Sequence, residues 1–176
     1  DVMEIEGIRC TTPDRTLFDL GCTARPELSL TCADAFLSTI ALDGRLVRHE
    51  VLHAWRARML SRLDASRGAR GVRRLRRIVE LADPRAESPL ESVSRLQLHR
   101  LGFELDLQVC VAAPRGGHYS LDFEFLGLDL FGECDGKVKY RDPRMLAGRT
   151  PRQLVYDEKR REDWIRGTTR KGLIRW

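Results

Sequence analysis

The sequence has no apolar run that approaches the length of a membrane-spanning helix, and no signal-peptide pattern is visible near Asp1. Its five cysteines are widely spaced, odd in number and form no C-x-x-C pair. This usage argues against a zinc knuckle or a disulfide framework and suits a reducing compartment. We therefore expect a cytoplasmic protein without a membrane partner. Because the first residue is Asp rather than Met, we also expect a fragment of a longer chain.

Lysine is scarce too, since only four of the 31 basic residues are lysines, and arginine supplies most of the net charge of +5. Between Arg45 and Glu80 the chain has eleven arginines against three acidic residues, a local charge of +8. Such a segment indicates a polyanionic partner, with DNA as the first hypothesis. The alternative is a solvated helical face in an arginine-rich sequence. The candidate DNA contacts in this segment are Arg73, Arg74 and Arg77.

The first half is predicted to be mostly helical. It opens with a short hairpin over Met3–Thr12 that turns at Glu6–Gly7. A helix follows, with Thr12 as its N-cap and Pro13 at its first position, and it runs to about residue 21. Apolar residues at helical spacing predict three more helices. These cover residues 28–42, 48–60 and 69–82.

A break at Ala82-Asp83-Pro84 ends this helical part. We therefore predict two domains, residues 1–83 and residues 84–176. Ser88-Pro89-Leu90-Glu91 is a capping box that begins a helix of the second domain. The later elements are strands within 105–111 and 119–139, a helix from Thr150-Pro151 to about 166, and a strand over 173–176. The order helix, three strands, helix, strand predicts an α+β fold with a mixed sheet.

The stretch Tyr119–Lys139 alternates between apolar and charged residues around a turn at Leu126–Gly127, which predicts a β-hairpin with one charged face. Pairing about the turn brings Asp122 close to Glu133. Crowded carboxylates repel each other, and a divalent cation is the common remedy. The alternative is a solvated face with ordinary cross-strand pairs. The charged residues of this face are Asp122, Glu124, Glu133, Asp135, Lys137 and Lys139.

Metal-dependent nucleases need a carboxylate pair to hold the ion and a lysine or its equivalent near the scissile phosphate. Asp122, Glu133 and Asp135 are therefore the expected ligands of Mg²⁺ or Mn²⁺. Lys137 or Lys139 would take the lysine role, and the sequence leaves this choice open.

Four segments strengthen this interpretation: SPLES (88–92), LDFEF (121–125), GECDGKVKY (132–140) and EKRRED (158–163). With the element order, they resemble the PD-(D/E)xK restriction-endonuclease-like superfamily, in particular a bacterial domain related to very-short-patch-repair endonucleases. The resemblance implies a restriction-endonuclease-like α-β-β-β-α-β core, metal ligation by Asp122 and Glu133 with Asp135 nearby, and a catalytic role for Glu91. Glu91 has a simpler alternative, because a capping-box glutamate is satisfied by its own backbone.

Residues 10–85, with TTPDRTLFDLG at 11–21, resemble the region that precedes this domain in AbiEi-like antitoxin proteins of type IV toxin–antitoxin systems. The winged helix that such proteins usually carry at the N-terminus does not occur in this sequence. The resemblance allows a toxin or another protein as a partner.

His49-Glu50-Val51-Leu52-His53 matches the letters of the zinc motif H-E-x-x-H. On a helix, this motif puts two imidazoles on one face, with Glu50 as a base and Glu80 as a conceivable third ligand. However, the segment starts a helix in an arginine-rich bundle, and nothing nearby suggests an edge strand that would hold a peptide. We therefore expect two ordinary helix histidines and no zinc.

Lys159 and Arg161, in the last predicted helix, are candidate contacts to DNA phosphates near the acidic face. The alternative is an i,i+3 pair between Glu158 and Arg161 with the rest of the segment solvated, and we expect a mixture in which Glu158 orients Arg161. The leading hypothesis is a Mg²⁺-dependent or Mn²⁺-dependent endonuclease that hydrolyses DNA phosphodiester bonds. The runner-up is a non-catalytic DNA-binding regulator or an antitoxin-like protein that binds a partner.

Overall fold

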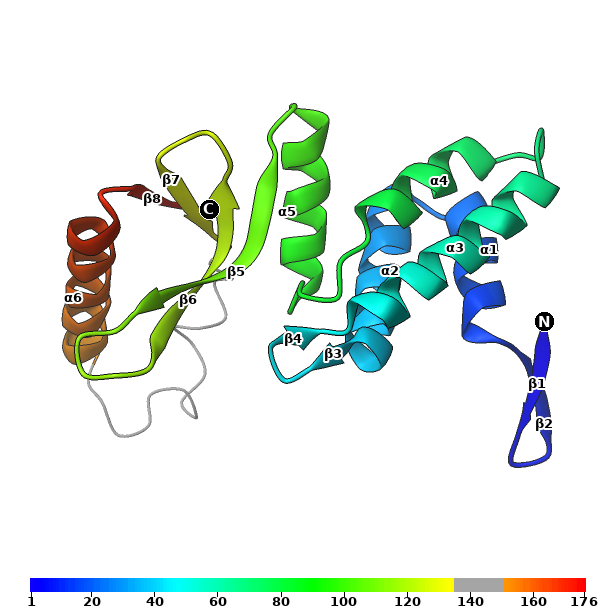
Figure 1. The fold of residues 1–176 in the computed structure, drawn as a ribbon, viewed down its shortest axis with the longest axis horizontal. Helices are drawn as coiled ribbons and strands as arrows, with labels where there is room; N and C mark the ends of the chain where they lie inside the picture. Colours follow the sequence, from blue (N-terminus) through cyan, green and yellow to red (C-terminus); the bar gives the residue numbers. More distant parts are fainter. Residues whose placement is uncertain (135–150) are drawn as a thin grey trace. The chain divides into compact units, whose positions relative to one another are not determined.

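The computed structural model describes residues 1–134 and 151–176 and has an α+β architecture (Figure 1). The chain divides into two compact units, Asp1–Leu96 and Gln97–Trp176. This division falls inside helix α5 (Pro89–Arg100), and the boundary predicted after residue 83 lies earlier, in the loop before that helix. Within the described ranges, no helix is both long and apolar enough to cross a membrane.

Four helices build the first unit before α5 begins. They are α1 (Pro13–Thr23), α2 (Pro26–Ala41), α3 (His49–Ala65) and α4 (Val72–Leu81). Helix α2 packs against the other three, and α4 also packs against α1 and α3. Their apolar faces meet in one core, in which the exposed fractions of Leu30, Leu37, Trp55 and Leu63 are 1% or less. The four helices correspond to the predicted ones, with ends that differ by a few residues.

Two small hairpins accompany these helices. Strands β1 (Val2–Ile5) and β2 (Ile8–Thr11) pair around Glu6 and Gly7, both of which have positive φ. That combination is the backbone of a tight two-residue hairpin turn, and it confirms the predicted hairpin. Strands β3 (Leu42–Asp43) and β4 (Leu46–Val47) form a second hairpin, where the sequence predicted only the end of a helix.

Local capping fixes two of the helix starts as predicted. The hydroxyl of Thr12 accepts the N–H of Arg15 at 3.4 Å at the start of α1, with Pro13 at the first helical position. At the start of α5, the hydroxyl of Ser88 accepts the N–H of Glu91 at 3.2 Å. Each hydroxyl satisfies a backbone donor that has no partner within its helix.

The second unit is built on a four-stranded mixed sheet in the order β5-β6-β7-β8. Its elements are β5 (Leu105–Ala112), β6 (His118–Phe125), β7 (Leu130–Glu133), α6 (Pro151–Thr169) and β8 (Gly172–Arg175). Strand β6 runs antiparallel to both β5 and β7, and β8 lies parallel to β7 after the crossover through α6. The predicted element order and the mixed sheet are therefore confirmed.

The backbone of β5 is irregular at Gln108, a kink at which φ is 53°. Positive φ is uncommon for a residue other than glycine and interrupts the alternation of side chains along a strand. The two neighbours of Gln108 pair with Leu121 and Phe123 of β6. Leu121 packs in one cluster with Ile165 of α6, whereas the ring of Phe123 stacks on Trp176. The apolar residues of β6 thus have different packing partners on either side of the kink, which strict alternation does not predict.

Candidate functional site

Asp122 and Glu133 lie on neighbouring strands of the second unit. The register between β6 and β7 pairs Phe123 with Gly132, and its continuation by one residue sets Asp122 across from Glu133. One carboxylate oxygen of Asp122 accepts the backbone N–H of Cys134 at 2.7 Å. The side chain of Asp122 therefore reaches the end of β7, beside Glu133, as the hairpin pattern predicted.

Glu133 is held between two arginines. Arg161 of α6 donates two hydrogen bonds to it, one of them at 3.0 Å from Nη1 to Oε2. Arg175, its partner in the parallel register of β8, donates from Nε to Oε2 at 2.9 Å. The Glu133 side chain is only 11% exposed. Both of its oxygens are therefore engaged by cations that the fold itself supplies.

These two arginines connect Glu133 to its surroundings. Arg161 also donates to the backbone carbonyl of Ser120 at 2.8 Å, and its guanidinium lies 5.6 Å from the ring centre of Tyr119. Arg175 forms further ion pairs along α6, with Glu158 at 3.0 Å and Glu162 at 3.3 Å. The result is a network of charges that ties α6 and β8 to the middle of the sheet.

The network keeps Glu133 ionised. Burial alone would raise the pKa of this carboxyl, but hydrogen bonds and charge attraction from Arg161 and Arg175 outweigh burial and hold its pKa below the usual range. In return, although burial opposes it, Glu133 raises the pKa of both arginines. All three groups are charged at neutral pH, and Glu158 and Glu162 supply further negative charge beside Arg175.

The described residues do not by themselves make a cation site. Among residues 1–134 and 151–176, no group of three or more acidic, histidine or cysteine side chains is arranged to hold a metal ion. Glu133 would have to give up arginine partners before it could bind one. Asp135, Lys137 and Lys139, the other residues predicted for this site, lie outside the described residues. The predicted Mg²⁺ or Mn²⁺ site stays a prediction.

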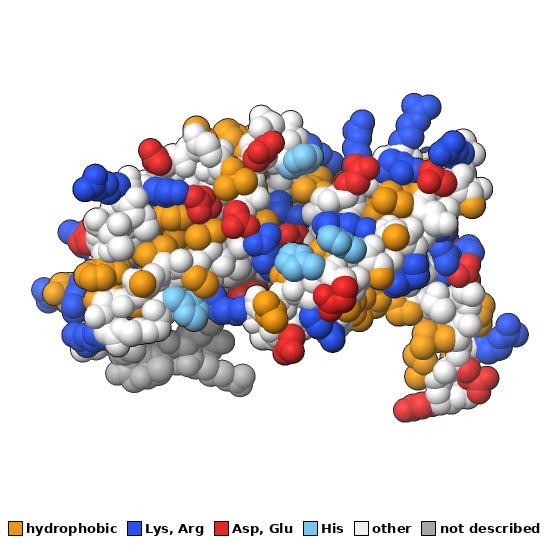
Figure 2. All heavy atoms as spheres, viewed as in Figure 1, with side chains coloured by type: hydrophobic (Ala, Val, Ile, Leu, Met, Phe, Trp, Pro, Cys, Tyr) orange, Lys and Arg blue, Asp and Glu red, His pale blue; other side chains and the backbone are white. Residues whose placement is uncertain are grey.

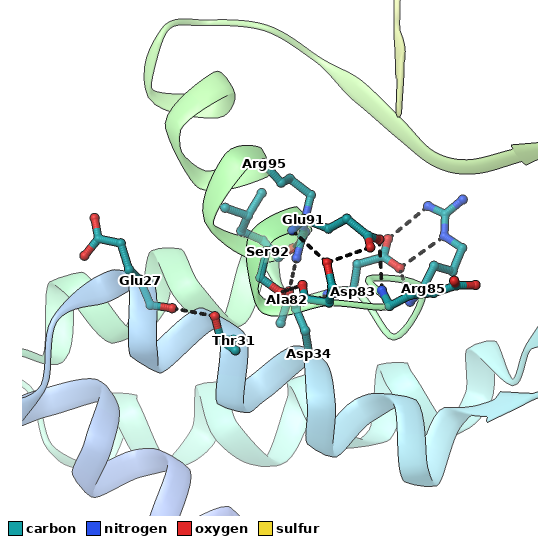
Figure 3. A network of polar contacts seen from close by, with 12 residues as sticks. Glu27, Thr31, Asp34, Ala82, Asp83, Arg85, Glu91, Ser92 and Arg95 are labelled. Atoms are coloured by element: carbon teal, nitrogen blue, oxygen red, sulfur yellow. Dashed lines mark hydrogen bonds and ion pairs between the residues drawn. The ribbon is translucent and has the colours of Figure 1, made fainter. Parts of the chain in front are cut away.

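Glu91 belongs to the first unit and works as a cap. One of its oxygens accepts the Ser88 hydroxyl at 2.7 Å, and the other accepts the N–H of Glu87 at 2.9 Å (Figure 3). The side chain is buried, with 6% exposed. These contacts are those of the capping alternative, and they engage both oxygens of the carboxylate.

Figure 3 also shows a buried ion pair that the sequence did not reveal. Arg95 of α5 binds Asp34 of α2 at 2.5 Å, and their side chains are 4% and 1% exposed. Asp34 also accepts the N–H of Asp83 at 2.9 Å. Burial raises the pKa of Asp34, while Arg95 opposes that rise. The pair ties the middle of α5 to α2.

Most arginines of the basic segment serve the fold. Arg74 is the clearest case, because it donates to the carbonyls of Gly21 and Cys22 at 3.3 and 2.7 Å, at the end of α1. The last carbonyls of a helix have no partner within the helix and favour a cation. Arg74, one of the predicted DNA contacts, thus has a structural role at the end of α1. The other arginines with acidic or carbonyl partners include Arg48, Arg56, Arg58, Arg62, Arg67 and Arg76.

Arg70, Arg73 and Arg77 behave differently. All three are exposed, and none has a hydrogen bond or an ion pair with the described part of the chain. Arg70 lies in the loop before α4, and Arg73 and Arg77 lie at exposed positions of α4. Figure 2 shows basic side chains projecting from this region of the first unit. We call Arg70, Arg73 and Arg77 the exposed arginine row.

The two basic residues predicted as DNA contacts on α6 have different environments. Lys159 is exposed and lines a pocket whose charged residues are of both signs. The others are Glu158, Glu162, Asp163, Arg166 and Arg175. Arg161 is engaged by Glu133, as described above. Of the two predicted contacts, Lys159 therefore lies on a surface of mixed charge, and Arg161 is bound to an acid of the sheet.

The histidines of the H-E-x-x-H match lie on the first turns of α3. The ring centres of His49 and His53 are 6.2 Å apart, and both side chains are exposed. Within the described ranges, no third acidic, histidine or cysteine ligand completes a metal site with them.

Arg175 is the site residue that sequence reasoning missed. Only the topology could have indicated this residue, because a strand that follows a crossover helix returns parallel to β7 and sets its residues opposite those of β7.

A scan against protein-family models, a search of curated proteins and a search of solved structures each found no match to this chain. The resemblance to the PD-(D/E)xK superfamily therefore stays a prediction.

Proposed function

We propose that this protein binds DNA through the exposed arginine row, Arg70, Arg73 and Arg77. The observation that carries the proposal is that these three cations lack partners among the described residues, while most of their neighbours are used within the fold. A cation that is not needed for folding remains available to neutralise a phosphate. Each phosphate that it neutralises releases condensed counterions, which favours binding.

The proposal is tested with the triple variant Arg70→Glu, Arg73→Glu, Arg77→Glu. Arg74 is left intact, because a glutamate there would face the carbonyls of Gly21 and Cys22 and disturb the fold. We expect weaker binding of a labelled duplex in fluorescence anisotropy and a salt slope that falls by about one for each phosphate that is no longer neutralised. Unchanged affinity and slope would contradict the proposal.

The matched control replaces the same three arginines by lysine. Lysine keeps the charge that neutralises a phosphate, so binding without sequence preference should be largely retained. A reduction of binding in the lysine variant as large as that in the glutamate variant would point to a structural defect. Circular dichroism of both variants checks that the helical unit remains folded.

A second candidate is hydrolysis of DNA by the second unit, assisted by Mg²⁺ or Mn²⁺. The observation that favours it is the position of Asp122 beside Glu133 on adjacent strands, within the element order that resembles a nuclease core. The described residues alone do not fit a metal, and we derive no catalytic step from them. The candidate depends on Asp135 and the lysines at 137 and 139.

Cleavage of supercoiled plasmid, linear duplex and single-stranded DNA with Mg²⁺ or Mn²⁺ tests this second candidate. Asp122→Asn is the matched variant, because its amide oxygen can still accept the N–H of Cys134 while the charge is removed. Nicking by the original protein that disappears in Asp122→Asn would support hydrolysis. Absence of nicking by the original protein would leave DNA binding as the function.

A further inference from the structure

A pocket of about 690 Å³ opens at the start of α4, where the chain turns out of α3. Its charged lining consists entirely of arginines, and the remaining lining residues are Gly, Ala and Val. The four arginines are Arg67, Arg73, Arg74 and Arg76. No acidic side chain lines this pocket, in contrast to the pocket along α6.

The balance of charge around the pocket is strongly positive. One carboxylate oxygen of Asp64 binds both Arg67, at 3.3 Å, and Arg76, at 2.7 Å. Hydrogen bonds from Arg76 and Arg67 lower the pKa of Asp64, so this carboxylate is ionised at neutral pH. Arg74 binds only neutral carbonyls, and Arg73 has no partner within the described residues. Four cations thus face one anion.

The base of the pocket is held in place by close packing. Gly71 has a φ of 85°, and a Cβ at this position would lie 2.2 Å from the carbonyl oxygen of Cys22. Arg74 donates to that same oxygen, so the loop before α4 is fixed against the end of α1 from two directions. Guanidinium groups that are already positioned lose less conformational entropy when they bind an anion.

We infer that this pocket binds a phosphate group. Guanidinium groups match phosphate oxygens in paired hydrogen bonds, and a surplus of positive charge favours an anion. The inference rests on the proposed DNA-binding function, in which the DNA backbone supplies the phosphate. Arg73 then belongs both to the pocket and to the exposed arginine row.

The first measurement uses inorganic phosphate as the probe, at constant ionic strength set with chloride, on ¹⁵N-labelled protein. The backbone N–H signals of Gly68 and Gly71, which line the pocket, should shift and saturate, whereas that of Gly127 in the second unit should not. Arg73→Glu should remove the saturation. Arg9→Glu makes the same change of charge on an exposed strand residue outside the pocket and should leave it intact.

The second measurement identifies the source of the phosphate. If the DNA backbone occupies the pocket, a duplex should compete with inorganic phosphate, and Arg73→Glu should weaken duplex binding by about tenfold, which corresponds to about 1.4 kcal/mol. Saturable phosphate binding together with duplex affinity that is independent of Arg73 would uphold the pocket but refute the proposed DNA contact. A linear, non-saturating response of Gly68 and Gly71 would overturn the pocket itself, whatever the duplex result.

Discussion

Replacing Glu133 by glutamine should destabilise the protein, and the sign of this change distinguishes two accounts of the acidic site. In the structure, Glu133 forms ion pairs with both Arg161 and Arg175. If the carboxylate serves mainly as their counterion, its removal leaves two partly buried cations facing a neutral amide. If instead Glu133 is a strained metal ligand crowded by other acids, its neutralisation should leave the metal-free protein as stable as before or more stable.

The magnitude follows from the burial of the three side chains. Glu133 is 11% exposed, and Arg161 and Arg175 are 22% and 24% exposed. Exposed ion pairs contribute about 0–1 kcal/mol, whereas removal of one partner from a fully buried pair costs about 3–5 kcal/mol. This triad lies between the two limits, and glutamine retains one acceptor oxygen. We therefore expect a decrease of about 2–3 kcal/mol in the free energy of unfolding at pH 7.

The pH dependence gives an independent check. The pKa of Glu133 is lowered in the folded state, so its contribution to stability is fully present above the ordinary glutamate pKa of about 4.3. That contribution is lost as the pH falls through the folded-state pKa, because the protonated carboxyl no longer balances the arginines. The stability difference between the original protein and Glu133→Gln should therefore narrow below about pH 4.

Urea unfolding followed by circular dichroism between pH 3 and pH 7 measures this difference. Asp129→Asn is the matched control, because it makes the same acid-to-amide change at an exposed residue of the turn before β7. It should change stability by no more than about 0.5 kcal/mol. A Glu133→Gln protein at least as stable as the original at pH 7, without metal, would refute the counterion account and favour the metal-ligand account.

Two further predictions concern the first unit. Asp34→Leu should lower the free energy of unfolding by about 3–5 kcal/mol, because Arg95 would stay buried without its counterion. Adding Arg95→Met should recover most of that stability, as measured by urea unfolding. A double variant as unstable as the single one would contradict this account. Gly21→Ala should lower stability by about 1–3 kcal/mol, because its Cβ would lie 2.2 Å from Leu75 Cδ1. In thermal melts, Gly167→Ala in α6 is the control: it has nothing within 4 Å and should be neutral or stabilising.

Helices and their ends could be predicted from the sequence where the signal is local. The cap of Thr12, the capping box at Ser88 and the turn at Glu6–Gly7 each depend on residues within four positions of one another. The hairpin of β3 and β4 was missed because its strands have two residues each, too short for an alternation to show. The kink at Gln108 was missed because a positive φ at glutamine has no signature in the sequence.

Ion pairs between residues far apart in the sequence could not be predicted from local signals. Asp34 and Arg95 are 61 positions apart, and nothing in the spacing of either residue indicates the other. Arg74 is equally hidden among eleven arginines of one segment, although it alone among the three predicted contacts is tied to the end of α1. A charge count identifies a basic segment, but only packing shows which cations the fold has already used.

The same argument applies to the acidic hairpin. Alternation placed Asp122 near Glu133 correctly, although the connection between the two strands covers Leu126–Asp129 and not only the predicted turn at Leu126–Gly127. It could not show that Arg161 and Arg175 already neutralise Glu133, since these arrive from a later helix and from a parallel strand. Repulsion between carboxylates calls for a cation, but a guanidinium supplied by the fold satisfies that need as well as a metal does. Whether Glu133 can exchange one for the other is therefore the physical question on which hydrolysis depends, and the stability of Glu133→Gln without metal addresses it directly.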